Sequence, residues 1–281
     1  MLACVAEPVH AQLGFLGPRG TFSEQAAETY RERTPSVGDT LPFETMTAVV
    51  DALRAGRVAR AVLPVASTVA GFPPESSRLL LGAPDPGFRV VAELVVPVEL
   101  HLVVKPGTAR ERIRRILSHP NALGEARALL DARYPGVPRE ETASTAAAAE
   151  LVKDGDGSLA AVASLAAARL YGLEVLDRAI QEDPHNATSF WVLARAEDAP
   201  QANAATRLVL LLEAPPGSDV LSETVARLHE AGLSVVFVES RPLPGELYGF
   251  RYLISLASET IVSTERLERA TRGRALRLGW F

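Results

Sequence analysis

A short stretch near the amino end decides the fold, and it reads Leu13-Gly14-Phe15-Leu16-Gly17-Pro18-Arg19-Gly20-Thr21-Phe22-Ser23. Its first residues, 13–17, have the apolar pattern of a short buried strand that runs into a glycine turn. Thr21 or Ser23 can cap a helix that begins around Ser23. A strand followed so closely by a helix presents free backbone N–H groups and the positive end of the helix dipole, which together favour an anion.

The same alternation of strands and helices continues along the chain. Apolar stretches predict strands at residues 60–65, 90–104, 160–162 and 189–193. Amphipathic stretches predict helices at residues 47–55, 109–117, 121–134, 145–153 and 164–171. Strands that alternate with helices over this length indicate an α/β domain with a mostly parallel sheet.

The composition changes at residues 196–205, which have no apolar period and are typical of a linker. Beyond them the pattern predicts strands at 206–212, 234–239 and 248–256, and helices at 221–230 and 263–272. The order β-α-β-β-α fits a ferredoxin-like sandwich. We therefore expect two domains, residues 11–196 and residues 205–281.

Composition and charge exclude several classes of protein. A hydrophobic share of 47% is enough for a hydrophobic core, and a net charge of −5 does not indicate the basic surface that binds nucleic acid. Cys4 is the only cysteine, so neither an intrachain disulfide nor a cysteine metal cage is expected. Residues 1–10 lack the pattern of a signal peptide, and no apolar run reaches the ~20 residues of a membrane span. We expect a cytoplasmic protein without membrane or nucleic-acid partners.

Several motifs lie in the order in which one enzyme family has them. Residues 16–23 resemble the opening motif of that family, and Glu239-Ser240-Arg241-Pro242 is its regulatory signature unchanged. Similar stretches are Ser118-His119-Pro120-Asn121-Ala122-Leu123, residues 144–148, residues 168–176 and Leu278-Gly279-Trp280-Phe281. Agreement over nearly the whole chain is far more specific than any one motif, so the chain resembles the prephenate dehydratase family.

The resemblance implies a fold and a reaction. The fold is a two-lobed α/β domain like that of periplasmic binding proteins, followed by a ferredoxin-like α+β domain of the ACT type. The reaction is the decarboxylative dehydration of prephenate to phenylpyruvate in L-phenylalanine biosynthesis. It requires neither a metal nor an organic cofactor, and the family's members lead us to expect a homodimer or homotetramer.

Three motifs depart from the family pattern, at four positions. The loop Pro-Ile-Glu-Asn-Ser-x-x-Gly falls on residues 64–71, so Ala66 and Ser67 replace the Glu and the Asn. The Arg of Asn-x-Thr-Arg-Phe becomes Ser189, and a family His falls on Leu100. His101 is next to it, but a shift of one residue along a strand turns a side chain to the other face.

The resemblance also implies the residues of the site. Thr188 is expected at the leaving hydroxyl, with a further hydrogen bond from Thr68. The expected substrate-binding residues are Gly20, Thr21, Ser23, Ser67, Asn186, Ser189 and Phe190. Loss of an Arg that reaches the substrate would cost about 1.5–3 kcal/mol, or roughly ten- to a hundredfold in rate or binding. Two simpler interpretations are that His119 is a turn or packing residue and that Glu125 lies on a solvated helix face.

In related ACT domains phenylalanine binds between two subunits. The residues that correspond to its site here are Gly217, Val220, Leu221, Glu239, Ser240, Arg241 and Pro242. Asp219 adds a carboxylate to a normally apolar loop, where it can repel the carboxylate of an amino acid or attract its ammonium group. Two further functions stay open: a decarboxylase of prephenate or an analogue that keeps the ring hydroxyl, and a non-catalytic amino-acid sensor.

Overall fold

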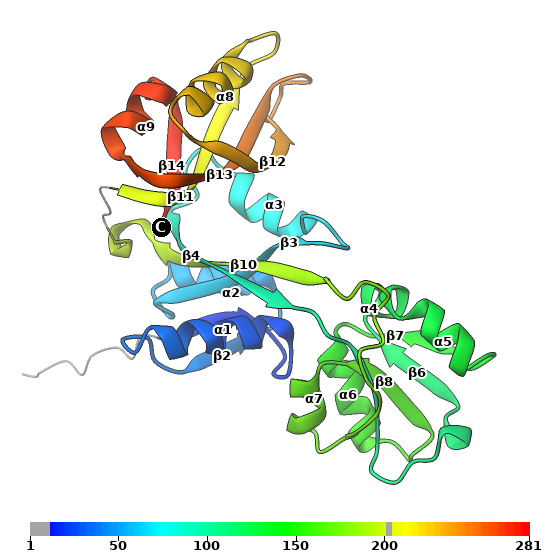
Figure 1. Cartoon of the computed structure of the whole chain (residues 1–281). Coiled ribbons are helices and arrows are strands. Elements are labelled where there is room, and N and C mark those ends of the chain that lie inside the picture. The colour runs from blue at the N-terminus through cyan, green and yellow to red at the C-terminus, as the bar shows by residue number, and fades with distance from the viewer. Residues whose placement is uncertain (1–11, 201–203) are drawn as a thin grey trace, which may run out of the picture.

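The computed structural model describes residues 12–200 and 204–281. The predictions for Cys4 and residues 1–10, and residues 201–203 of the predicted linker, lie outside the described residues. The described chain folds into two α/β lobes and a carboxyl-terminal sandwich (Figure 1). None of the described helices is long and apolar enough to cross a membrane.

The first lobe is built on β1 (Leu13–Leu16), β2 (Thr40–Phe43), β3 (Arg60–Ser67), β4 (Phe88–Pro97) and β10 (Ala187–Arg195). Strands β2, β1 and β3 are parallel, whereas β10 is antiparallel to both β3 and β4. The prediction of a mostly parallel sheet is therefore wrong for this lobe. The reason is that the chain leaves the lobe along β4 and returns along β10, side by side in opposite directions (Figure 1).

Three helices accompany this sheet: α1 (Phe22–Arg33), α2 (Met46–Arg54) and α3 (Pro74–Leu81). Helix α1 covers one face, where Ala26 and Ala27 pack with Phe15 and Phe190. Helices α2 and α3 cover the other face, around the fully buried Trp191. The two faces of β10 therefore belong to different cores.

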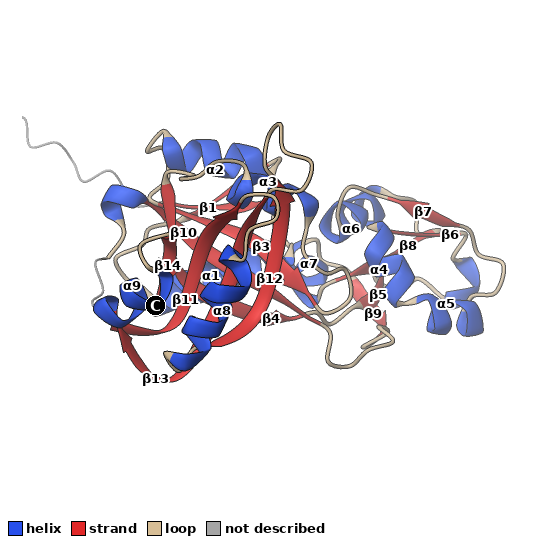
Figure 2. Ribbon diagram, turned by 90° about the horizontal axis from the view of Figure 1, so that it is seen from above, coloured by secondary structure: helices blue, strands red, loops and turns tan. Residues whose placement is uncertain are grey.

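The second lobe follows β4 and contains the strands β5 (His101–Val104), β6 (Arg115–Ser118), β7 (Arg139–Glu141), β8 (Leu159–Ala163) and β9 (Glu174–Asp177). Its helices are α4 (Pro120–Glu125), α5 (Arg127–Arg133), α6 (Thr145–Asp154) and α7 (Leu165–Leu170). The strand order is β7-β6-β8-β5-β9. Figure 2 shows this lobe beside the first one.

Two predicted helices of this lobe are corrected. Residues 109–117 form a short 3-10 turn (Arg110–Arg112) and then β6, because β6 finds partners on both sides in β7 and β8. Such pairing partners are distant in the sequence and override a local helical pattern. The predicted helix 121–134 is divided into α4 and α5 at Ala126.

The carboxyl-terminal sandwich consists of β11 (Ala204–Ala214), α8 (Val220–Glu230), β12 (Ser234–Pro242), β13 (Phe250–Ser263), α9 (Thr264–Thr271) and β14 (Ala275–Trp280). Strand β14 completes a β-α-β-β-α-β order that the sequence pattern predicted only up to the last helix. It also pairs with β4 through Gly279 and Val90, so the sandwich continues the sheet of the first lobe. A Cβ on Gly279 would lie 2.8 Å from the Val90 Cβ, so only glycine permits this approach.

Candidate active site

A cavity of about 700 Å³ lies between the two lobes. Its polar lining in the first lobe is formed by Arg19, Thr21, Ser23, Glu44, Ser67, Asn186 and Thr188. Its polar lining in the second lobe is formed by His119, Asn121, Glu125, Ser144 and Thr145. The rest is largely apolar, with residues such as Phe22, Phe43, Pro64, Val98 and Leu100. An apolar cavity with a few convergent polar groups is the usual form of a small-molecule site.

Helix α1 begins at the wall of this cavity. Thr21 caps it as predicted, since its hydroxyl accepts a hydrogen bond from the Glu24 N–H at 3.3 Å. The N–H groups of Phe22 and Ser23 find no acceptor among the described residues. Both residues line the cavity, and the Ser23 hydroxyl likewise has no hydrogen-bond partner within the described chain. These donors, at the positive end of the helix dipole, can receive a carboxylate.

Helix α6 begins at the opposite wall, in the second lobe. Ser144 caps it by accepting a hydrogen bond from the Ala147 N–H at 3.0 Å. In the described structure the N–H groups of Thr145 and Ala146 have no acceptor. The two lobes thus present a free helix amino terminus each, and the cavity separates them.

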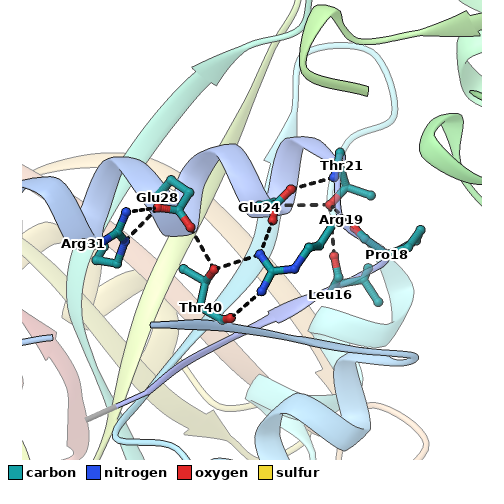
Figure 3. A network of polar contacts seen from close by, with 9 residues as sticks. Leu16, Pro18, Arg19, Thr21, Glu24, Glu28, Arg31 and Thr40 are labelled. Atoms are coloured by element: carbon teal, nitrogen blue, oxygen red, sulfur yellow. Dashed lines mark hydrogen bonds and ion pairs between the residues drawn. The ribbon is translucent and has the colours of Figure 1, made fainter. Parts of the chain in front are cut away.

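Gly20 has a different role from the predicted one. Its N–H donates to the Glu24 carboxylate at 2.6 Å, so it is not available to a substrate. The other Glu24 oxygen accepts from Arg19 at 2.6 Å, and Figure 3 shows this network continuing to Thr40. The Gly20 carbonyl accepts from Ser164 of the second lobe at 2.9 Å. Gly20 therefore joins the lobes, and its φ of +87° suits glycine.

Thr188 lines the cavity from β10. It lies opposite Ser67 of β3, which also lines the cavity, and opposite Val96 of β4. The Thr188 hydroxyl makes no hydrogen bond to any other residue that the structure describes. A hydroxyl that is held by a strand and has no partner is free to bind a ligand.

Thr68 is exposed and does not line the cavity. Its hydroxyl donates to the Asn186 Oδ1 at 3.1 Å and accepts from the Ala187 N–H at 3.1 Å. Asn186 is buried and lines the cavity, and its Nδ2 donates to Glu125 at 2.5 Å. The geometry corrects the prediction for Thr68, because its hydroxyl orients the Asn186 amide and does not face a ligand.

Ser189 and Phe190 do not reach the cavity either. The alternation of a strand turns Ser189 to the face opposite Thr188, where its hydroxyl donates to Glu93 at 2.8 Å. Glu93 also forms an ion pair with Arg207 of the sandwich. Phe190 is 2% exposed and packs in the core under α1. The predicted substrate contacts of both residues are therefore corrected.

The register of β3 and β10 connects two of the motif departures. Ala66 is the direct cross-strand partner of Ser189. Ala66, like Ser189, does not line the cavity, whereas their neighbours Ser67 and Thr188 do. The positions at which the family carries Glu and Arg thus face each other on the side of the sheet away from the cavity.

The third departure lies on the cavity. Leu100 lines it, while His101 is turned away and buried. The His101 Nδ1 accepts a hydrogen bond from the Ala179 N–H at 3.3 Å, and burial lowers the pKa of this imidazole. His101 is therefore no substitute for the family's His.

Sequence reasoning undervalued two residues of the second lobe. His119 caps α4, with its Nδ1 accepting from the Asn121 N–H at 3.3 Å, and burial lowers its pKa, which favours the neutral ring. Glu125 lines the cavity instead of a solvated face. Burial raises the pKa of its carboxyl, and the hydrogen bond from Asn186 opposes part of that rise. The available signal was their place in or just after the motif at 118–123.

The described residues contain no cluster of three or more His, Cys, Asp or Glu side chains able to hold a metal ion. Arg19 is the cavity-lining arginine, and its guanidinium is already paired with Glu24. Negative charge on a ligand would therefore be met mainly by backbone N–H groups in this part of the structure.

The predicted effector residues lie at one end of the sandwich. Gly217, Val220 and Leu221 form the turn into α8 and its first residues, directly after β11. Residues 239–242 end β12. Ala214, at the end of β11, and Pro242 both pair with Phe250 of β13, so the two segments lie at the same end of the sheet. The Glu239 carboxylate also accepts a hydrogen bond from Ser77 of α3 at 3.1 Å.

Comparison with known proteins gives the family. The family model described as prephenate dehydratase matches residues 13–198. A bifunctional chorismate mutase/prephenate dehydratase of Stutzerimonas stutzeri is 31% identical over 245 residues, which cover 86% of this chain and 64% of that protein. The prephenate dehydratase of Lactococcus lactis is 31% identical over 250 residues, which cover 87% of this chain and 86% of that protein.

One solved structure is similar to this chain over nearly its whole length. The structure of GqqA, described as a novel type of quorum quenching acylase, superposes on this chain with a TM-score of 0.79 at 27% identity, and the match covers 95% of this chain and 96% of GqqA. The chain spans about two thirds of the length of the bifunctional relatives, since the match covers 64% of the one from Stutzerimonas stutzeri. From the family model and the relatives together, the chain belongs to the prephenate dehydratase family.

Proposed function

We propose that this protein is a prephenate dehydratase, which converts prephenate to phenylpyruvate, carbon dioxide and water. The observation that carries the proposal is the pair of free helix amino termini, of α1 and α6, on opposite walls of one cavity that the unpaired Thr188 hydroxyl also lines. Prephenate is a dianion with one carboxylate on the ring and one on the pyruvyl side chain. The two termini offer N–H donors to one carboxylate each.

The reaction asks little more of the protein. Aromatisation of the ring supplies the driving force, so the enzyme must hold the dianion, exclude water and assist the departure of the ring hydroxyl. Thr188 is the residue we assign to that hydroxyl, as a hydrogen-bond donor. We assign further substrate contacts to Ser23 and Ser67, which line the cavity from the same lobe.

The motif departures at Ala66 and Ser189 are compatible with activity. In a relative with Glu and Arg at these positions, the two side chains would be cross-strand partners on the face away from the cavity. Loss of both together leaves no unpaired charge, whereas loss of one would. We infer that these two substitutions removed an ion pair of the sheet rather than a contact to the substrate.

Acylase chemistry is less well supported than dehydration. Hydrolysis of an acyl amide by a protein hydroxyl needs a general base at that hydroxyl. Among the described residues, no hydroxyl that lines the cavity hydrogen-bonds a histidine, and the His119 Nδ1 is occupied by the Asn121 N–H.

Incubation of the purified protein with prephenate at neutral pH tests the proposal. Absorbance of phenylpyruvate, together with release of carbon dioxide, is the expected result. A non-aromatic keto acid would instead support the decarboxylase that keeps the ring hydroxyl. Unchanged substrate would support the non-catalytic sensor.

We further propose that residues 11–196 form the catalytic domain and residues 205–281 an ACT-type regulatory domain that binds L-phenylalanine. The β-α-β-β-α-β order supports it, as does the position of Gly217, Val220 and Leu221 at the same end of the sheet as residues 239–242. The site would be completed by a second copy of the chain in a homodimer or homotetramer. Titration with phenylalanine that leaves rate, stability and assembly state unchanged would refute the effector role.

A further inference from the structure

We propose that Glu125 is the proton donor to the hydroxyl that leaves the substrate. The inference rests on the proposed dehydratase function and adds a catalytic residue to it. The family often has Gln at this position, which can donate an amide hydrogen bond but cannot give up a proton. The role is therefore a feature of this chain.

The geometry holds one carboxyl oxygen and leaves the other free. The Glu125 Oε2 accepts from the Asn186 Nδ2 at 2.5 Å, and the Asn186 Oδ1 in turn accepts from Thr68 at 3.1 Å. The Glu125 Oε1 has no hydrogen-bond partner among the residues that the structure describes. Asn186, which holds the Glu125 carboxyl, precedes Thr188 by two residues in the sequence, and all three residues line the cavity.

The surroundings favour the protonated form of this carboxyl. Half-burial raises its pKa, and the hydrogen bond from Asn186 opposes part of the rise. Glu125 is the last residue of α4, where the negative end of the helix disfavours a second negative charge. The ionisable groups that line the two cavities it adjoins are Arg19, Glu44, His119, Glu182 and Asp183. Arg19 is paired with Glu24, the lowered pKa of His119 favours its neutral form, and the remaining three are acids that oppose ionisation of Glu125.

The step balances without a co-reactant. The bond between the ring carbon and the hydroxyl oxygen breaks with its electron pair on oxygen, which takes the Glu125 proton and leaves as water. The bond between the ring and its carboxylate breaks, its pair enters the ring and carbon dioxide leaves. Glu125 then regains a proton from solvent, for which the second cavity it adjoins, of about 460 Å³, gives access.

The test compares wild type, Glu125→Gln and Glu150→Gln with prephenate over a range of pH. Gln keeps the shape of Glu and an oxygen for the Asn186 amide. Glu150 is an exposed residue of α6 in the same lobe, outside the cavity lining, so its variant is a matched control. We expect kcat of Glu125→Gln to fall about a hundredfold with little change in KM, as general acid catalysis commonly contributes at least that much.

The pH profile separates proton donation from positioning. Wild-type kcat should fall as pH rises through the pKa of Glu125, because the active form carries the proton. This fall should disappear in Glu125→Gln, persist in Glu150→Gln and return in Glu125→Asp. An active wild type whose kcat and pH profile survive in Glu125→Gln would overturn the role of Glu125 alone. A wild type that leaves prephenate intact would overturn both this role and the dehydratase function.

Discussion

Restoring the family residues at positions 66 and 189 gives a quantitative test of the sheet geometry. The variants are Ala66→Glu, Ser189→Arg and the double variant. Since the two residues are direct cross-strand partners, their Cβ atoms lie about 5 Å apart, and an opposite-charge pair there contributes about 0.2–1 kcal/mol. We expect the double-mutant cycle to give a favourable coupling energy of this size.

The two single variants should differ from each other in stability. Ala66→Glu alone would place an unpaired carboxylate on the face that holds Glu93, with β10 between the two, so the repulsion should be small, about 0.4 kcal/mol or less. In Ser189→Arg alone, the new guanidinium can share Glu93 with Arg207, so the effect on stability should be small. Urea unfolding followed by tryptophan fluorescence, to which the fully buried Trp191 of this lobe and Trp280 of the sandwich contribute, measures each free energy of unfolding.

Activity decides whether position 189 reaches the substrate. An arginine that bonds a substrate carboxylate would be worth about 1.5–3 kcal/mol, or roughly ten- to a hundredfold in kcat/KM. Because Ser189 faces Glu93 and not the cavity, we expect kcat/KM of Ser189→Arg to stay within about twofold of wild type. A tenfold rise would refute the assignment of faces along β10.

Three other outcomes follow from the structure. Asp177→Asn should lower the free energy of unfolding by about 2 kcal/mol in urea titration, since its buried carboxylate accepts from Arg110, Arg133 and Tyr134. Burial alone would raise the pKa of Asp177, but these donors hold it below the ordinary value. The stability that the Asp177 carboxylate contributes is therefore present above about pH 4 and is lost as pH falls through the lowered pKa. Acid titration of the wild type and of Asp177→Asn checks this. Thr21→Ala should cost about 1 kcal/mol in thermal unfolding and raise KM, since it removes the cap of α1. Phe237→Ala should lower the free energy of unfolding by about 2 kcal/mol and shift the tryptophan emission, because the Phe237 ring stacks on that of Trp191 with the ring centroids 5.8 Å apart.

Local patterns were sufficient where neighbours in the sequence are neighbours in space. The strand and turn at residues 13–17 and the start of the following helix, where Thr21 is the cap among the two candidates, are of this kind. The region 109–117 is not, because the strand β6 exists only through pairing with β7 and β8. A charged, apparently amphipathic stretch carries no mark of such partners.

The site shows the same division. The motif order singled out Thr188, Ser23, Ser67 and Asn186, and all four line the cavity. The orientation of Thr68 depends on Asn186, which is 118 residues away, and the setting of Glu125 depends on the same side chain across 61 residues. Likewise, the relation of Ala66 to Ser189 is a property of the register between β3 and β10. Relations of this kind, between residues far apart in the sequence, are seen only in the three-dimensional structure.

The most direct measurement of the central claim is the single-turnover conversion of prephenate by Thr188→Val. Valine keeps the shape of threonine and removes only the hydroxyl, so the two helix amino termini should still bind the dianion. We predict an unchanged Kd and a rate of phenylpyruvate formation that falls about a hundredfold. An undiminished rate would contradict the assignment of the Thr188 hydroxyl to the leaving group.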